Sequence, residues 1–113
     1  MVAVAAVAAA LLAGATTPHA AVQRFIANRT PADACAQLAP SYKAALAKQY
    51  GPCVVGMRHQ PKASHIRTSG EKIAGSKATV IASYIVGPSH FKERYTLTRS
   101  RGVWLITGAK QIP

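Results

Sequence analysis

The stretch spanning residues 30–53 constrains the fold more than any other part of the chain, because it combines helix boundaries with both cysteines. Thr30 is a favourable N-cap residue, and Pro31 suits the first helical turn, where its missing N–H costs nothing. Asp33 is placed where an acid can reach back to the cap, and Gly51-Pro52 ends the helical pattern. The stretch is therefore predicted to be helical, with defined boundaries at both ends.

An apolar stripe follows this segment at helical spacing and consists of Cys35, Leu38, Ala39, Tyr42, Leu46 and Tyr50. Pro40 interrupts it. Two arrangements are compatible with this proline. Either one helix kinks there, or a short helix ends at Ala39 and a second one begins with Pro40 in its first turn, weakly capped or uncapped.

The N-terminal region has the composition of an export signal. The first fifteen residues contain only Met, Val, Ala, Leu and Gly, and small residues at A-x-A-like spacing follow, which predicts cleavage near Ala20 or Ala21. We therefore predict a signal peptide over residues 1–20 and a single domain over 21–113, secreted or located at the cell envelope. The alternative is an uncleaved membrane anchor, for which residues 1–22 are barely long enough.

A secretory context favours a disulfide between the two cysteines, Cys35 and Cys53. The bridge would close a loop of about 18 residues and contribute about 3 kcal/mol on the chain-entropy model. A straight helix through this stretch rises about 1.5 Å per residue. It would leave the Cα atoms of Cys35 and Cys53 much farther apart than the roughly 6 Å that a disulfide requires. The bridge therefore requires a sharp turn near Pro40. A reactive or metal-binding pair is the alternative, but the spacing is not C-x-x-C.

The charge is strongly one-sided: 14 Lys and Arg residues stand against Asp33, Glu71 and Glu93, which gives a formal net charge of +11. Such a chain attracts nucleic acid, anionic lipid head groups and other anionic polymers. The basic residues are dispersed along the sequence without a run of five, which favours a simpler role in solubility.

Helical patterns come first in the chain. Residues 22–29 place Val22, Phe25 and Ile26 on one face of a short amphipathic helix ahead of the 30–53 stretch. Residues 54–70 have no sustained period and are predicted to be a connection, with one short strand over Ser64–Thr68.

Strand patterns follow the helical ones. A β-branched run over Lys77–Val86 is apolar on both faces, which predicts a central covered strand. Residues 90–100 alternate strictly, Ser100–Gly102 forms a hairpin turn, and Val103–Ile112 returns as a last strand with a bulge or bend at Gly108. Helices followed by an antiparallel meander predict an α+β fold, with N-terminal helices packed on a curved, cone-like sheet.

An opening amphipathic helix, the triplet Asp33–Cys35, the later Cys53 and a closing hairpin with Gly102–Ile106 together resemble small secreted proteins of the nuclear transport factor 2-like superfamily. Many such proteins come from high-GC Gram-positive bacteria, and the 23 alanines suit that source. The resemblance covers about Val22–Ile112 and implies a cystatin-like cone of curved sheet around helices, with a pocket at the open end. The superfamily includes enzymes and non-enzymatic modules, so it decides little about function.

The candidate pocket residues are Tyr42, Tyr84, Glu93, Tyr95 and Trp104, although periodic aromatic residues are more often plain core. Glu93 shares the parity of the inward-facing residues of its strand, which makes it the one acid suspected of a role. An exposed or Arg-paired glutamate is the simpler alternative. Neither a catalytic constellation nor a metal site is predicted, because the acids and histidines are scattered. No cofactor is expected.

The function favoured by these observations is a secreted, non-enzymatic binding or accessory module at the cell envelope, with a small apolar ligand or an envelope partner. One alternative is a cyclase- or isomerase-type enzyme that uses Glu93 or His90, which an apolar, closed pocket would favour. Another is a basic domain that binds an anionic polymer, which a contiguous basic face would favour. Relatives in the superfamily often pair face to face, so a homodimer through the sheet is a further expectation.

Overall fold

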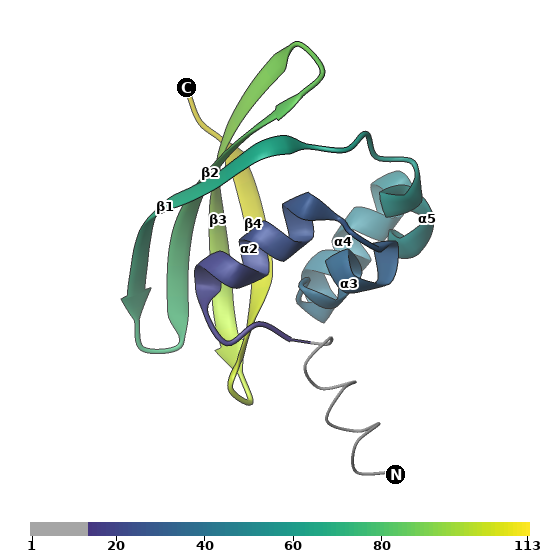
Figure 1. Ribbon diagram of the computed structural model, residues 1–113. Coiled ribbons are helices and arrows are strands. Elements are labelled where there is room, and N and C mark those ends of the chain that lie inside the picture. The colour runs from purple at the N-terminus through teal and green to yellow at the C-terminus, as the bar shows by residue number, and fades with distance from the viewer. Residues whose placement is uncertain (1–13) are drawn as a thin grey trace, which may run out of the picture.

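The computed structural model describes residues 14–113, and it confirms the predicted α+β class (Figure 1). Within these residues, four short helices precede a four-stranded antiparallel sheet. The helices are α2 (Pro18–Ala27), α3 (Pro31–Ala36), α4 (Pro40–Tyr50) and α5 (Cys53–Arg58). The strands are β1 (Ser64–Ala74), β2 (Lys77–Val86), β3 (Ser89–Ser100) and β4 (Val103–Gln111).

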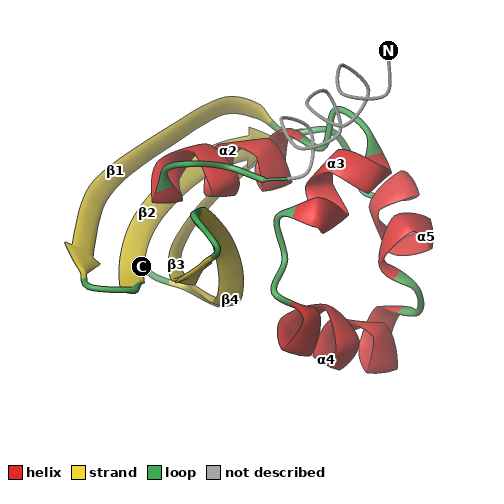
Figure 2. Ribbon diagram, turned by 90° about the horizontal axis from the view of Figure 1, so that it is seen from below, coloured by secondary structure: helices red, strands yellow, loops and turns green. Residues whose placement is uncertain are grey.

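The sheet is a meander in which every strand pairs with its sequence neighbour, in the order β1-β2-β3-β4. Figure 2 shows it curling around α2. The closing hairpin turns at Arg101 (φ 53°) and Gly102 (φ 80°), and positive φ at both central residues matches the right-handed twist of the strands. The predicted irregularity at Gly108 is also found: Thr96 pairs with Gly108 but Leu97 pairs with Ile106, so β4 contains one extra residue.

Strand pairing separates the side chains into two faces. The inner face, which is concave and packs against the helices, contains the buried residues Val80, Ala82, Tyr95, Leu97 and Ile106. The buried Ala21 and Val22 of α2 fill the concave side. The outer face contains the alternate residues of the same strands, and none of the described helices, α2 to α5, lies over it (Figure 2). The single core therefore lies between α2 and the inner face.

Helix α2 begins at Pro18, earlier than the amphipathic pattern predicted. Its N-cap is Thr17, whose side chain accepts a hydrogen bond from the Ala20 N–H. Ala15 is buried, and its carbonyl accepts a hydrogen bond from the Trp104 N–H at 2.9 Å. Residues 14–20 thus form part of the packed domain, whereas residues 1–13 of the predicted signal peptide lie outside the described residues.

The 30–53 stretch forms two helices rather than one kinked helix. As the second alternative predicted, α4 begins with Pro40 and has no side-chain cap, but α3 ends at Ala36, three residues before the predicted Ala39. The Cys35–Cys53 disulfide is confirmed, with 6.0 Å between the Cα atoms. The chain between the two cysteines therefore folds back on itself, which brings the start of α5 against α3.

Two local expectations differ from the structure. Asp33 does not reach back to the cap; instead its Oδ1 pairs with the Arg24 guanidinium of α2 at 2.5 Å, because packing of α2 on α3 offers a cation as partner. The Thr30 side chain still accepts from the Asp33 N–H. The region 54–70 contains most of α5, which was not predicted, and the strand predicted over Ser64–Thr68 is found as the start of β1. Pairing with β2 extends β1 to Ala74, beyond the local pattern.

Candidate functional site

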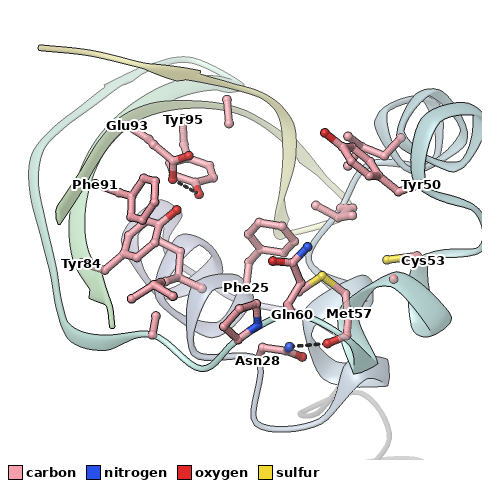
Figure 3. Close-up of a pocket in the computed structure, with 18 of the residues that line it drawn as sticks. Phe25, Asn28, Tyr50, Cys53, Met57, Gln60, Tyr84, Phe91, Glu93 and Tyr95 are labelled. Carbon is pink, nitrogen blue, oxygen red and sulfur yellow. Dashed lines mark hydrogen bonds between the residues drawn. The ribbon is translucent and has the colours of Figure 1, made fainter. Parts of the chain in front are cut away.

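A pocket of about 470 Å³ lies on the concave side of the sheet (Figure 3). Its walls come from elements far apart in the sequence: Phe25 from α2, Tyr42 and Leu46 from α4, and Tyr84 and Glu93 from β2 and β3. The lining is mostly aromatic and aliphatic, and the volume is that of a typical small-molecule site. The curvature of the sheet creates the space, because α2 covers only part of the inner face.

Among the described residues, the Glu93 carboxylate is the only charged group that lines this pocket. Its side chain is partly buried, and its Oε1 accepts a hydrogen bond from the Tyr95 hydroxyl at 2.7 Å. Within residues 14–113, no lysine, arginine or histidine forms an ion pair with it. The carboxylate is therefore stabilised by a neutral hydrogen-bond donor rather than by a positive charge, in a protein with 14 Lys and Arg residues.

Aromatic rings surround this carboxylate. Tyr84 and Phe91, directly opposite one another on β2 and β3, stack with ring centroids 5.3 Å apart. Phe25 meets Tyr95 edge to face at 6.3 Å. Figure 3 shows these rings grouped beside Glu93, while Phe25 reaches toward them from α2. The polar end of the pocket is thus a carboxylate within an aromatic wall.

The tyrosines near Glu93 have perturbed acidity. Burial, and then the negative charge of Glu93, raises the pKa of Tyr95 far above its ordinary value. The same two causes, in the same order, raise the pKa values of Tyr84 and Tyr42. These phenols therefore remain protonated and act as hydrogen-bond donors throughout the physiological pH range.

Asn28 supplies a second polar group to the pocket wall. It ends α2 in a left-handed conformation (φ 46°), is 4% exposed, and donates its Nδ2 to the Met57 carbonyl at 2.8 Å. Its Oδ1 is buried and has no hydrogen-bond partner among the described residues. A buried, unpartnered acceptor at a pocket wall is costly unless a ligand or water satisfies it.

Helix α4 forms a loosely packed side of the pocket. Tyr42, Leu46 and Tyr50 recur along it at helical spacing and line the pocket, yet no residue of α4 is buried. Tyr50, at the end of the helix, is 61% exposed. The apolar stripe of this helix therefore faces the pocket instead of a filled core.

Most of the predicted pocket residues lie together. Tyr42, Tyr84, Glu93 and Tyr95 line the pocket, so Glu93 is neither fully exposed nor paired with an arginine. Trp104 does not line it: the indole is 3% exposed in the core, with the Arg99 guanidinium 5.6 Å from its ring centroid. The inner face is longer than the pocket, and α2 and Ala15 cover the part to which Trp104 belongs.

Other functional residues were not foreseen or lie elsewhere. Asn28 and the α5 residue Met57 were missed, because a helix C-cap and an unpredicted helix carry no pocket pattern in the sequence. The sequence feature that could have identified part of this pocket is the amphipathic pattern of residues 22–29, which placed Phe25 on the inward face of its helix. His90 is exposed on the outer face and does not belong to the pocket.

The described residues hold neither a cluster of metal ligands nor a membrane-spanning helix. Residues 14–113 contain no cluster of three or more His, Cys, Asp and Glu side chains with the proximity that a metal ion requires. Among the helices of the same region, none is both long enough and apolar enough to cross a membrane.

Comparisons with known proteins inform the fold. No protein-family model matches the chain, and no curated protein matches it. The fold is similar to that of a SEC-C motif containing protein from Rhodopseudomonas palustris. That solution structure matches with a TM-score of 0.60 over 88% of this chain and 82% of the other, at 17% sequence identity. At this identity the likeness concerns the fold alone.

Proposed function

We propose that the protein is a non-enzymatic binding module whose pocket takes a small organic cation, with an apolar body and an ammonium group paired with Glu93. The observation that carries this proposal is the charge of the lining: one carboxylate and no basic side chain, although the formal net charge of the chain is +11. An ammonium ligand would supply the missing positive charge and, over the Tyr84 and Phe91 rings, cation–π attraction.

The second acceptor supports the same ligand class. The unpartnered Oδ1 of Asn28 and the carboxylate of Glu93 both accept hydrogen bonds, so the pocket favours a ligand with donors. An anionic ligand would face Glu93 without any basic residue to compensate its charge. An apolar body is expected because aromatic and aliphatic side chains form most of the wall.

Calorimetry with matched probes tests this assignment. Hexylamine, hexanol and hexanoate share an apolar chain and differ in charge. We expect hexylamine to bind at least about 10-fold more tightly than hexanol, which corresponds to about 1.4 kcal/mol, and hexanoate to bind more weakly than both. Glu93→Gln should abolish the preference for the amine and leave hexanol binding unchanged, because it removes only the charge.

Glu71→Gln is the matched control, since it removes one negative charge outside the pocket. Equal loss of amine preference in both variants would show that overall charge, not the pocket, selects the ligand. Equal affinity of the wild-type protein for amine and alcohol would also contradict the proposal.

A cyclase- or isomerase-type activity is the second candidate, because Glu93 lies in an apolar pocket where a general base could act beside a carbonyl. The Tyr95 hydroxyl, however, is donated to Glu93 itself and is not free to polarise a substrate carbonyl. We expect no turnover of ketosteroid, polyketide-like or ester substrates. Activity that Glu93→Gln abolishes would favour the enzyme over the binding module.

The disulfide and the curved sheet also bear on where the protein is located and on its superfamily. We propose an extracytoplasmic protein, secreted or at the cell envelope, which the Cys35–Cys53 disulfide and the apolar N-terminal sequence support. We also propose membership of the nuclear transport factor 2-like superfamily. The curved sheet around α2 and the pocket on its concave side agree with the cone that this resemblance implies.

A further inference from the structure

The outer face of the sheet gathers basic residues that are dispersed in the sequence. Alternation along the paired strands places six exposed cationic side chains there: Arg67, Lys72, Lys77, Lys92, Arg94 and Lys110. Arg94 and Lys110 are direct cross-strand partners, and Arg67 and Lys92 both pair with Ser83 of the strand between them. Strand pairing thus gathers charges that are scattered in the sequence on one face of the sheet.

None of the three acidic side chains of the chain neutralises this face. Asp33 pairs with Arg24 between two helices, and Glu93 lies in the pocket on the inner side. Glu71 accepts hydrogen bonds from the His19 side chain at 2.7 Å and from its backbone N–H at 3.0 Å, which hold the pKa of Glu71 below its usual value. All acidic side chains are therefore engaged away from the outer face.

A cleft of about 530 Å³ lies at one end of the same face. Its lining includes His65, Arg67, Ser83, His90 and Lys92, with no aspartate or glutamate. His65 has φ 53°, a left-handed conformation that a residue with a Cβ rarely adopts. The cleft offers N–H and O–H donors from three strands, which suits a tetrahedral oxyanion such as phosphate.

We propose that the outer face binds a linear polymer of phosphate groups and that the cleft seats one of those phosphates. Charge complementarity carries this inference, and it is independent of the ligand of the inner pocket. A flexible polymer can follow the convex outer face and contact cations on all four strands. A flat bilayer would contact only the most protruding part of this face. The polymer neutralises a face that the protein itself leaves uncompensated.

Other partners fit this face less well. Tyr95 and Trp104 are buried on the inner face. Tyr84 and Phe91 also border the cleft, but their rings stack on each other with centroids 5.3 Å apart, so this side of the sheet offers little free ring surface on which bases of a single-stranded nucleic acid could stack. A homodimer paired through this face would oppose Lys and Arg against Lys and Arg, which costs free energy.

Fluorescence anisotropy with labelled long-chain polyphosphate tests the proposal. We expect Arg94→Gln/Lys110→Gln and Arg67→Gln/Lys92→Gln each to weaken binding at least about 10-fold, and wild-type affinity to fall about 100-fold between about 50 and 200 mM salt. The control Lys48→Gln/Arg58→Gln removes the same two charges from exposed positions on α4 and α5 and should change affinity less than about 2-fold.

Several results would overturn the proposal. One is an equal loss in the control variant, which would show attraction by net charge alone. Another is unchanged affinity in both outer-face variants. Tighter binding of oligo-dT or of anionic phospholipid vesicles than of polyphosphate would assign the face to nucleic acid or to membrane instead. Circular dichroism of each variant verifies that the fold is retained.

Discussion

Glu93 shows how a single side chain defines the character of the pocket. A partly buried carboxylate loses much of its hydration, and it recovers that free energy through charge-assisted hydrogen bonds or a nearby cation. Here the Tyr95 hydroxyl provides the hydrogen bond and no cation lines the pocket. A positively charged ligand would compensate the remaining negative charge of Glu93.

The coupling between Tyr95 and Glu93 is measurable as stability. Tyr95→Phe keeps the ring but leaves the partly buried carboxylate without this donor, so we expect the free energy of unfolding at pH 7 to fall by about 1 to 3 kcal/mol. In Glu93→Ala/Tyr95→Phe the loss should be smaller than the sum of the single losses, because either single change removes the same hydrogen bond. Urea denaturation measures all three variants. Strict additivity would contradict the coupling.

The raised pKa values of Tyr42, Tyr84 and Tyr95 predict alkaline sensitivity. A phenol whose folded pKa exceeds its unfolded value of about 10 contributes stability that is complete below pH 10 and is lost as pH rises above it. Tyrosinate absorbance near 295 nm should therefore appear at higher pH in the native protein than in urea. Superimposable native and denatured titration curves would contradict this prediction.

At the scale of elements, the helical region depends on a covalent connection. Helix α4 buries none of its residues, and α5 has none that are buried, so apolar packing holds this side of the pocket weakly. The Cys35–Cys53 bridge closes a loop with a sequence separation of 18 and ties α5 to α3. Helix α4 is thus held in place at both ends: the Ala39 N–H just before it donates to the Ile106 carbonyl of β4, and the disulfide at Cys53 follows it.

Replacement of both cysteines by serine should lower the free energy of unfolding by about 2 to 4 kcal/mol, because the unfolded chain gains the entropy of an open loop. Urea denaturation of the wild-type and variant proteins measures the difference. The wild-type protein, denatured without reductant, should contain no titratable thiol. Detection of two free thiols would show that the bridge does not form in the isolated protein.

For the molecule as a whole, the segment before α2 closes one end of the core. Ala15 and Pro18 are buried, Thr17 caps α2, and the Trp104 N–H is satisfied by the Ala15 carbonyl. Cleavage near Ala20 or Ala21 would remove all of these contacts and the first turn of α2. Processing and stability of the folded domain are therefore linked.

A chain that starts at Gly14 should consequently be more stable than one that starts at Ala21. We expect the shorter chain to lose about 2 to 5 kcal/mol, from the missing N-cap and the unsatisfied N–H groups. Thermal denaturation compares the two, and mass spectrometry of the exported protein identifies the natural start. A mature protein that begins at Ala20 or Ala21 and is equally stable would contradict this prediction.

The local sequence determined the features that depend on a few neighbouring residues. Pro40 separated two helices because its ring excludes the preceding helical hydrogen bond, and Gly102 identified the hairpin because only glycine enters positive φ without cost. Gly108 marked the bulge, where an added Cβ would lie 3.0 Å from the Thr96 hydroxyl. The alternating pattern of β3 put Glu93 in the same parity as Phe91 and Tyr95, although it left an exposed or arginine-paired side chain as the simpler alternative.

Only the tertiary structure decided how these elements combine, because pockets and faces depend on distances between residues remote in sequence. Curvature of the sheet placed Trp104 in the core and Glu93 in the pocket, although both belong to the inner face. Packing against Trp104 drew Ala15 into the domain, against the composition of an export signal. Strand register, finally, assembled dispersed Lys and Arg residues on the outer face and left the pocket with a single negative charge.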